Sequence, residues 1–115
     1  MSVYDTQQID KVLYDEAAHA ITLLMIEDRD TYSSDKLLLE LQEKFNTYIR
    51  YATEGLLARH FPVWAGRPIT IRLEFKFAPG PESLDFLRKV EEHLRPIKIQ
   101  LQTVLIGPDE PSLMP

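Results

Sequence analysis

The stretch Ile69–Phe77, ITIRLEFKF, decides the fold, because it alternates strictly between apolar and polar side chains. Successive side chains of a β-strand point to opposite faces of the sheet, so this pattern predicts a strand with one face on a core and one face in water. The large apolar residues would point inward. The side chains expected to face water are Thr70, Arg72, Glu74 and Lys76.

The chain before this strand predicts a hairpin and a long helix. Residues 8–14 and 20–27 are two β-rich runs joined by a short polar turn. Residues 36–55 carry apolar side chains at spacings of three and four, which indicates one buried stripe of a helix that ends at Gly55. Lys44 should lie on the solvent side of that helix, paired with Glu40.

The chain after this strand predicts a second helix and a last strand. Pro81 suits the first turn of a helix over 82–94, with Leu84 among the inward side chains. Residues 97–106 again alternate between apolar and polar. Ile97 is expected to face the core there, and Lys98 and Gln100 to face solvent.

The predicted order of elements is ββαβαβ, which indicates the α+β class. We expect a four-stranded, largely antiparallel or mixed sheet with two helices packed on one face. Residues 1–107 would form a single domain, and the proline-rich segment 108–115 a disordered tail. The second face of the sheet would be open and could bind a partner through Arg72, Glu74, Lys76, Lys98 and Gln100.

The composition bears on the partners of the protein. Its 13 basic and 18 acidic side chains give a net charge of −5, and no basic stripe is present, so we expect no binding to nucleic acid. The absence of cysteine excludes disulfides and zinc–thiolate sites and fits a reducing cytosol. The sequence shows neither a signal peptide nor an apolar run of membrane-spanning length, so a soluble, cytoplasmic protein without membrane partners is expected.

The sequence contains no catalytic signature. Its four glycines are scattered, so no phosphate-binding loop is present, and His19, His60 and His93 lie far apart. The acidic segment that begins at Glu27 lacks the glycine and the glutamate that an EF-hand loop requires. We therefore predict no catalytic residue, no metal ligand and no cofactor.

The segment Arg59–Pro68, RHFPVWAGRP, contains the only tryptophan of the chain. One interpretation is an apolar plug, with Trp64 buried against the sheet or the long helix. The other is a binding loop, because tryptophan and arginine dominate binding hot spots. On that interpretation the candidate binding residues are Arg59, His60, Trp64 and Arg67.

The chain also resembles a family of small bacterial single-domain proteins of unknown function. The residues that carry the resemblance are IDKV near the start, LQEKFNTY in the long helix, and GRPITIRLEFKF after the tryptophan. The resemblance implies a single bacterial domain and assigns no activity. It draws attention to a polar set on the long helix, namely Gln42, Lys44, Asn46 and Tyr48.

These observations leave three hypotheses for the function. The first is a non-enzymatic protein-binding or accessory module of the immunity-protein kind, which acts through the open sheet face or the tryptophan loop. The second is a small-ligand-binding protein or an enzyme, with a pocket between the long helix and the loop that uses Arg59, His60, Arg67 and Tyr48. The third is a homodimer with an interface of Val12, Tyr14, Leu24 and Ile26.

Overall fold

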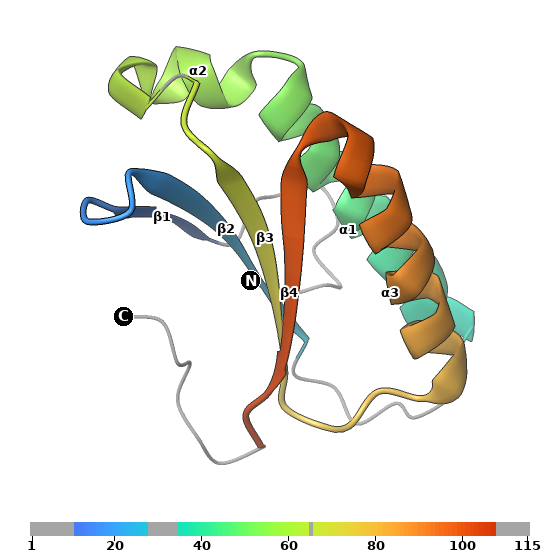
Figure 1. Cartoon of the computed structure of the whole chain (residues 1–115). Coiled ribbons are helices and arrows are strands. Elements are labelled where there is room, and N and C mark those ends of the chain that lie inside the picture. Colours follow the sequence, from blue (N-terminus) through green and yellow to red (C-terminus); the bar gives the residue numbers. More distant parts are fainter. Residues whose placement is uncertain (1–10, 28–34, 65, 108–115) are drawn as a thin grey trace.

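The computed structural model describes residues 11–27, 35–64 and 66–107 (Figure 1). The strands and helices, in chain order, are β1 (Lys11–Asp15), β2 (Ala20–Glu27), α1 (Asp35–Thr53), α2 (Leu56–His60), β3 (Ile69–Phe75), α3 (Pro81–Leu94) and β4 (Ile99–Leu105). Short 3-10 turns occur at Pro62–Trp64 and Arg95–Ile97. The predicted ββαβαβ order is confirmed, with α2 as an addition. The expected tail 108–115 and the first residues of the first β-run, 8–10, lie outside the described residues.

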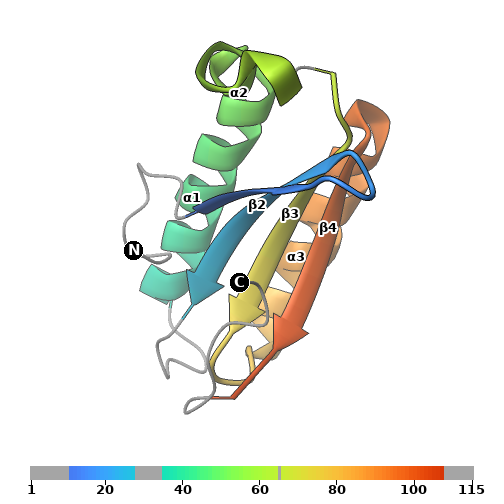
Figure 2. The ribbon, with the colours of Figure 1, turned by 90° about the vertical axis from the view of Figure 1, so that its left-hand side faces the viewer.

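The four strands form one mixed sheet in the order β1-β2-β3-β4. β1 and β2 are the predicted antiparallel hairpin, in which Tyr14 lies opposite Ile21. β2, β3 and β4 run parallel, with Leu23 beside Ile71 and Leu73 beside Thr103. Parallel neighbours need a long crossover, and α1 and α3 are those crossovers. Both helices cover the same face of the sheet (Figures 1 and 2).

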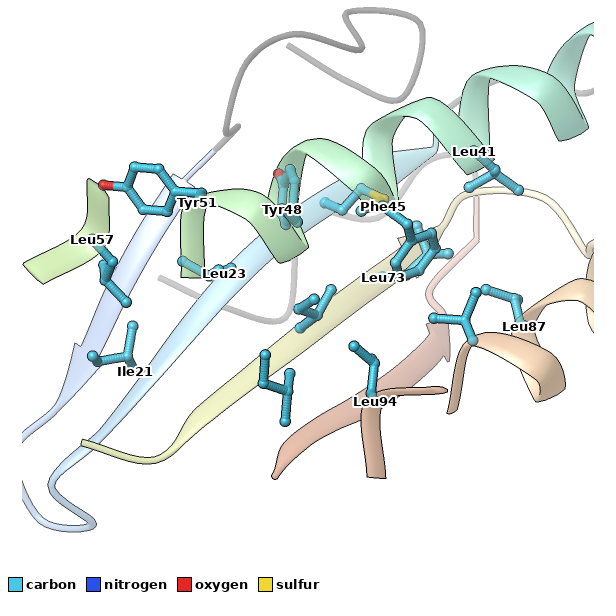
Figure 3. Close-up of a cluster of buried hydrophobic side chains, with 14 of the residues drawn as sticks. Ile21, Leu23, Leu41, Phe45, Tyr48, Tyr51, Leu57, Leu73, Leu87 and Leu94 are labelled. Atoms are coloured by element: carbon cyan, nitrogen blue, oxygen red, sulfur yellow. The ribbon is translucent and has the colours of Figure 1, made fainter. Parts of the chain in front are cut away.

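The core lies between the two long helices and the sheet (Figure 3). Leu41, Phe45 and Tyr48 form the inner stripe of α1 and are at most 1% exposed. The Phe45 ring meets Phe86 of α3 edge-on, with 5.9 Å between the centroids. The Tyr48 hydroxyl donates a hydrogen bond to the carbonyl of Leu24, which ties α1 to β2. This arrangement buries the stripe that the spacing of the sequence predicts.

The long helix ends where its sequence predicts, but the chain becomes helical again directly afterwards. Gly55 has a φ of +85°, a left-handed conformation that glycine adopts without strain. Its carbonyl then accepts a hydrogen bond from the Arg59 amide, inside the five-residue helix α2. Five residues are too few to show a helical period, so the sequence did not predict α2.

Three expectations about side-chain burial are wrong. Leu84 is 54% exposed and Ser83 is buried instead, because α3 is turned so that positions 83, 87, 90 and 94 face the sheet. Ile97 lies in the turn before β4 and is 41% exposed. Lys44 is fully buried, because it lies three residues after Leu41 on the inner stripe of α1, and its ammonium lies 5.6 Å from the centroid of the Tyr48 ring.

Candidate functional site

The face of the sheet opposite α1 and α3 is not the exposed polar surface that alternation predicts. Arg72 is 7% exposed and Glu74 is fully buried, so the expectation that they face water is wrong. Arg72 Nε donates to Glu74 Oε2 at 2.9 Å, and Arg72 Nη1 donates to Gln102 Oε1 at 2.7 Å. Among the described residues Glu74 Oε1 has no partner. The two charges therefore form a buried ion pair on this face of the sheet.

The other residues expected on that face are dispersed. Lys76 follows the end of β3, where its amide donates to the carbonyl of Glu27 at 2.9 Å. Lys98 has a φ of +61° and belongs to the turn before β4, so it is not a residue of the sheet. Only Gln100 is exposed on a strand as expected. The five predicted residues thus do not form one binding patch.

A hollow of about 640 Å³ adjoins the first half of β4. It is bounded by residues of the sheet face opposite the helices, of β4, of the C-terminal half of α3 and of the turn that follows α3. Its lining residues are Asp15, Ala20, Thr22, Thr70, Glu91, Arg95, Ile99, Gln100, Leu101 and Gln102. The hollow therefore extends along the start of β4 from the sheet face to α3.

β4 lies at one edge of the sheet and β1 lies at the other (Figure 2). The amide of Ile106 donates to the carbonyl of Phe75 at 2.9 Å, so the even-numbered amides of β4 point toward β3. The backbone groups of the odd-numbered residues then point away from the sheet, at Ile99, Leu101, Thr103 and Leu105. Within the described part of the chain, no strand pairs with this outer side of β4.

The flank of α3 beside β4 carries one apolar and three charged side chains. Glu91 and Arg95 line the hollow together with β4, and Leu84 and Arg88 lie on the same stripe at helical spacing. Arg95 approaches Glu91 at 3.7 Å, and Arg88 pairs with Asp85. All these charged groups lie largely in solvent.

Asp85 is also paired with Lys89, as its spacing predicts, at 3.3 Å between Oδ2 and Nζ. The hydrogen bond and the positive charge of Lys89 hold the pKa of the Asp85 carboxyl below its ordinary value, and Arg88 adds to this effect. The Asp85 carboxyl is therefore ionised at neutral pH. These ion pairs keep the outer surface of α3 polar around the exposed Leu84.

The tryptophan loop does not bring its four candidate residues together. His60 Nδ1 lies 3.1 Å from the hydroxyl of Tyr51, and burial raises the pKa of that hydroxyl above its ordinary value. The hydroxyl is therefore neutral at physiological pH. Tyr48, the tyrosine named beside His60 from the sequence, lies in the core instead. The Trp64 side chain lies outside the described part of the structure, so the choice between plug and binding loop stays open.

A pocket of about 440 Å³ lies between the end of α1 and this loop. Arg67 lines it, and neither Arg59 nor His60 does. Lys98 supplies a second positive charge, and apolar walls come from both sides of the pocket. The complete lining is Ala52, Thr53, Gly66, Arg67, Pro68, Ile69, Ile97, Lys98 and Ile99.

A groove of about 390 Å³ separates α1 from α3 on their outer side. Phe45, Ile49, Phe86 and Val90 form its floor, with Gln42, Asn46, Lys89 and His93 around it. The polar set on the long helix is thus divided. Gln42 and Asn46 line the groove, and Lys44 and Tyr48 lie in the core.

A family model described as a family of unknown function (DUF6572) matches residues 1–107. The chain belongs to DUF6572. The membership agrees with the resemblance seen in the sequence and brings no activity. Comparison with curated proteins and with solved structures gave no significant match.

The described residues of this DUF6572 protein bear on three further questions: a metal site, a membrane-spanning helix and the expected dimer interface. They contain no group of three or more His, Cys, Asp or Glu side chains that could hold a metal ion. Its helices, within the same residues, are too short or too polar to cross a membrane. The side chains expected at a dimer interface do not form an exposed apolar patch, because Leu24 is buried and Val12 and Tyr14 pack against the core.

Proposed function

We propose that this DUF6572 protein is a non-enzymatic, cytoplasmic protein-binding module that adds an extended segment of its partner to the free edge of β4. The observation that carries the proposal is the row of outward-facing amides and carbonyls along β4. Strand addition uses such a row for affinity, because the main chain of the incoming segment completes the ladder. The cysteine-free composition supports a reducing compartment.

The sequence of β4 supports this function, because it lacks the features that protect most edge strands. Proteins block exposed edges with charged side chains, prolines or bulges. Residues 99–107, IQLQTVLIG, contain no charge and no proline, and the register with β3 is uninterrupted. β1 differs, because it is only five residues long and has a charged residue at each end, Lys11 and Asp15. Of the two edges, β4 therefore suits an incoming strand.

Thr103→Pro is expected to abolish capture of partner proteins from a lysate of the cells that make this protein. Proline removes the outward amide at position 103 and places its ring in the path of an incoming strand. The amides that bond to β3 stay intact. Thr103→Ala is the matched control, because it retains the amide and should capture the same proteins as the wild type. Quantitative mass spectrometry of the captured proteins measures the effect.

The proposal requires that the two variants differ. Circular dichroism must show that Thr103→Pro is folded, and amide exchange should show slower exchange at Thr103 and Leu105 when a partner is bound. Equal capture by the proline and alanine variants would show that β4 is not the binding edge.

The pocket beside Arg67 favours a second candidate function, the binding of a small amphipathic carboxylate. Arg67 and Lys98 supply two positive charges, and Ile69, Ile97 and Ile99 supply apolar walls. Such a combination suits an anionic head with a short hydrocarbon tail, and a volume of about 440 Å³ is in the range of small-ligand pockets.

Titration with octanoate tests this second function. Arg67→Ala should weaken octanoate binding about tenfold, because a charge-assisted hydrogen bond contributes about 1.5–3 kcal/mol. Arg59→Ala is the matched control, since Arg59 is an exposed arginine of the same segment that does not line the pocket. Calorimetry that shows no heat of binding to the wild type, or equal affinities for the two variants, would exclude this function.

A further inference from the structure

We infer that the strand added to β4 is β4 of a second copy of this chain. The inference rests on the proposed function and names its partner. The two strands would run antiparallel about a two-fold axis beside Gln102, so that two four-stranded sheets join into one continuous sheet. A symmetric pair of this kind brings the same surface of both copies together.

The axis follows from the outward-facing residues of β4. When the pair is centred on Gln102, each β4 strand is paired along its whole length. Ile99 then lies opposite Leu105 of the second copy, and Leu101 lies opposite Thr103 of the second copy. Every outward amide and carbonyl along Ile99–Leu105 thereby gains a partner, because residues directly opposite each other in a hydrogen-bonded pair exchange both bonds. A shift of the axis by one residue in either direction leaves one end of each strand unpaired.

The shape of the surface beside β4 fits the same register. Leu105 is 57% exposed at the end of the strand. In the pair it lies opposite Ile99 of the other copy, where the hollow of about 640 Å³ is bounded by Glu91, Arg95, Ile99 and Leu101. The exposed leucine of each copy is therefore directed at the hollow of the other. Such a fit between a projecting side chain and a hollow is needed on both sides of a two-fold axis.

The charge distribution favours a second copy at this surface. The chain carries a net charge of −5, so two copies repel each other through most surfaces. β4 is neutral, and beside it Arg88 and Arg95 offset Glu91 and Asp15, the two acidic residues that line the adjoining hollow. This part of the surface is therefore free of the acidic excess. Two neutral strands also meet without placing like charges opposite each other, which would destabilise the pair.

The size of the surface determines the expected strength of association. A strand of seven residues is about 23 Å long, and the strand with its covering helix is about 15 Å deep. The resulting interface is smaller than the range of about 1,200–2,000 Å² that stable complexes bury. We therefore expect a dimer that forms at micromolar or higher concentrations rather than a permanent one.

Cysteine cross-linking tests the register, and the cysteine-free sequence makes every new thiol unique. Gln102→Cys should form a disulfide-linked dimer under mild oxidation, because the two residues at the axis have Cα atoms about 4.5 Å apart, within disulfide range. Gln100→Cys is the matched control on the same strand and the same face. Its two copies lie four residues apart along the pair, about 13 Å, which is too far for a disulfide.

Gln102→Cys also removes the hydrogen bond that Arg72 donates to Gln102. A second pair of variants therefore tests the same register without that loss. Gln100 lies opposite Val104 of the second copy in this register. A mixture of Gln100→Cys and Val104→Cys should therefore cross-link faster than either variant alone, because only the mixed pair lies within disulfide range. Sedimentation equilibrium of the wild type between about 1 μM and about 1 mM should show the mass rising toward that of two copies.

Two results would overturn the inference. One is a monomeric mass throughout the concentration series, and the other is equal cross-linking of the Gln102→Cys and Gln100→Cys variants. If the mass stays monomeric and Thr103→Pro still abolishes capture of a different protein, the second copy is excluded and strand addition at β4 stands. If the mass stays monomeric and Thr103→Pro captures normally, both the partner and the proposed edge are excluded.

Discussion

Replacing Phe45 with alanine is expected to lower the free energy of unfolding by about 3–5 kcal/mol. Phe45 is 1% exposed, lies on the inner stripe of α1, and contacts the ring of Phe86 on α3 edge-on. Truncation removes the buried ring area and leaves a cavity at the point where the two helices meet over the sheet. Denaturation with urea, analysed as a two-state transition, measures the loss.

Leu39→Ala is the matched control for this prediction. Leu39 is on the same helix and is 58% exposed, so its truncation should change stability by no more than about 0.5 kcal/mol. A loss of less than about 1 kcal/mol for Phe45→Ala would contradict the packing of α1 and α3 around this ring. The same result would call into question the apolar floor of the groove between the two helices.

Arg72→Met is expected to destabilise the protein by about 3–5 kcal/mol, because it leaves the buried carboxylate of Glu74 without its counter-charge. Glu74 is fully buried, and its only described partner is Arg72 Nε at 2.9 Å. The double variant Arg72→Met with Glu74→Leu should recover much of this loss, since replacing both members of a buried pair by apolar side chains is often neutral. Urea denaturation of the single and double variants measures the coupling.

The control for the buried pair is an exposed pair of the same residue types. Arg50 Nε, in the last turn of α1, lies 3.4 Å from Oε2 of Glu54 just after the helix, and both side chains are more than half exposed. Arg50→Met should therefore cost no more than about 1 kcal/mol, as exposed ion pairs do. Equal losses of unfolding free energy for Arg72→Met and Arg50→Met would show that the charges of Arg72 and Glu74 are solvated.

Local pattern was sufficient to predict most elements of the fold. The alternation in Ile69–Phe75 gave β3, and the spacing of Leu41, Phe45 and Tyr48 gave the inner face of α1. The local pattern failed for Leu84, because the choice between positions 83 and 84 as inward positions depends on how α3 is turned on the sheet. A rotation of that size leaves the apolar period of the helix almost unchanged, so the sequence carries little information about it.

The candidate site was predicted less well than the fold, and the reason is geometric. Arg72, Glu74, Lys76, Lys98 and Gln100 were grouped because they alternate with apolar residues. Alternation shows that side chains share a face, but it does not show whether that face is exposed or whether the residues lie close together. Arg67 lines a pocket at the end of the long helix, whereas the tyrosine beside His60 is Tyr51 and not Tyr48.

The sequence by itself determined the identity and order of the main strands and helices, because hydrophobic periodicity is a local property that each segment carries alone. Only the tertiary structure decided that β2, β3 and β4 run parallel and that β4 lies at the edge. Strand order depends on contacts between residues far apart in the chain, and no local pattern encodes them. The outer side of β4, which no described strand pairs with, is a consequence of that order.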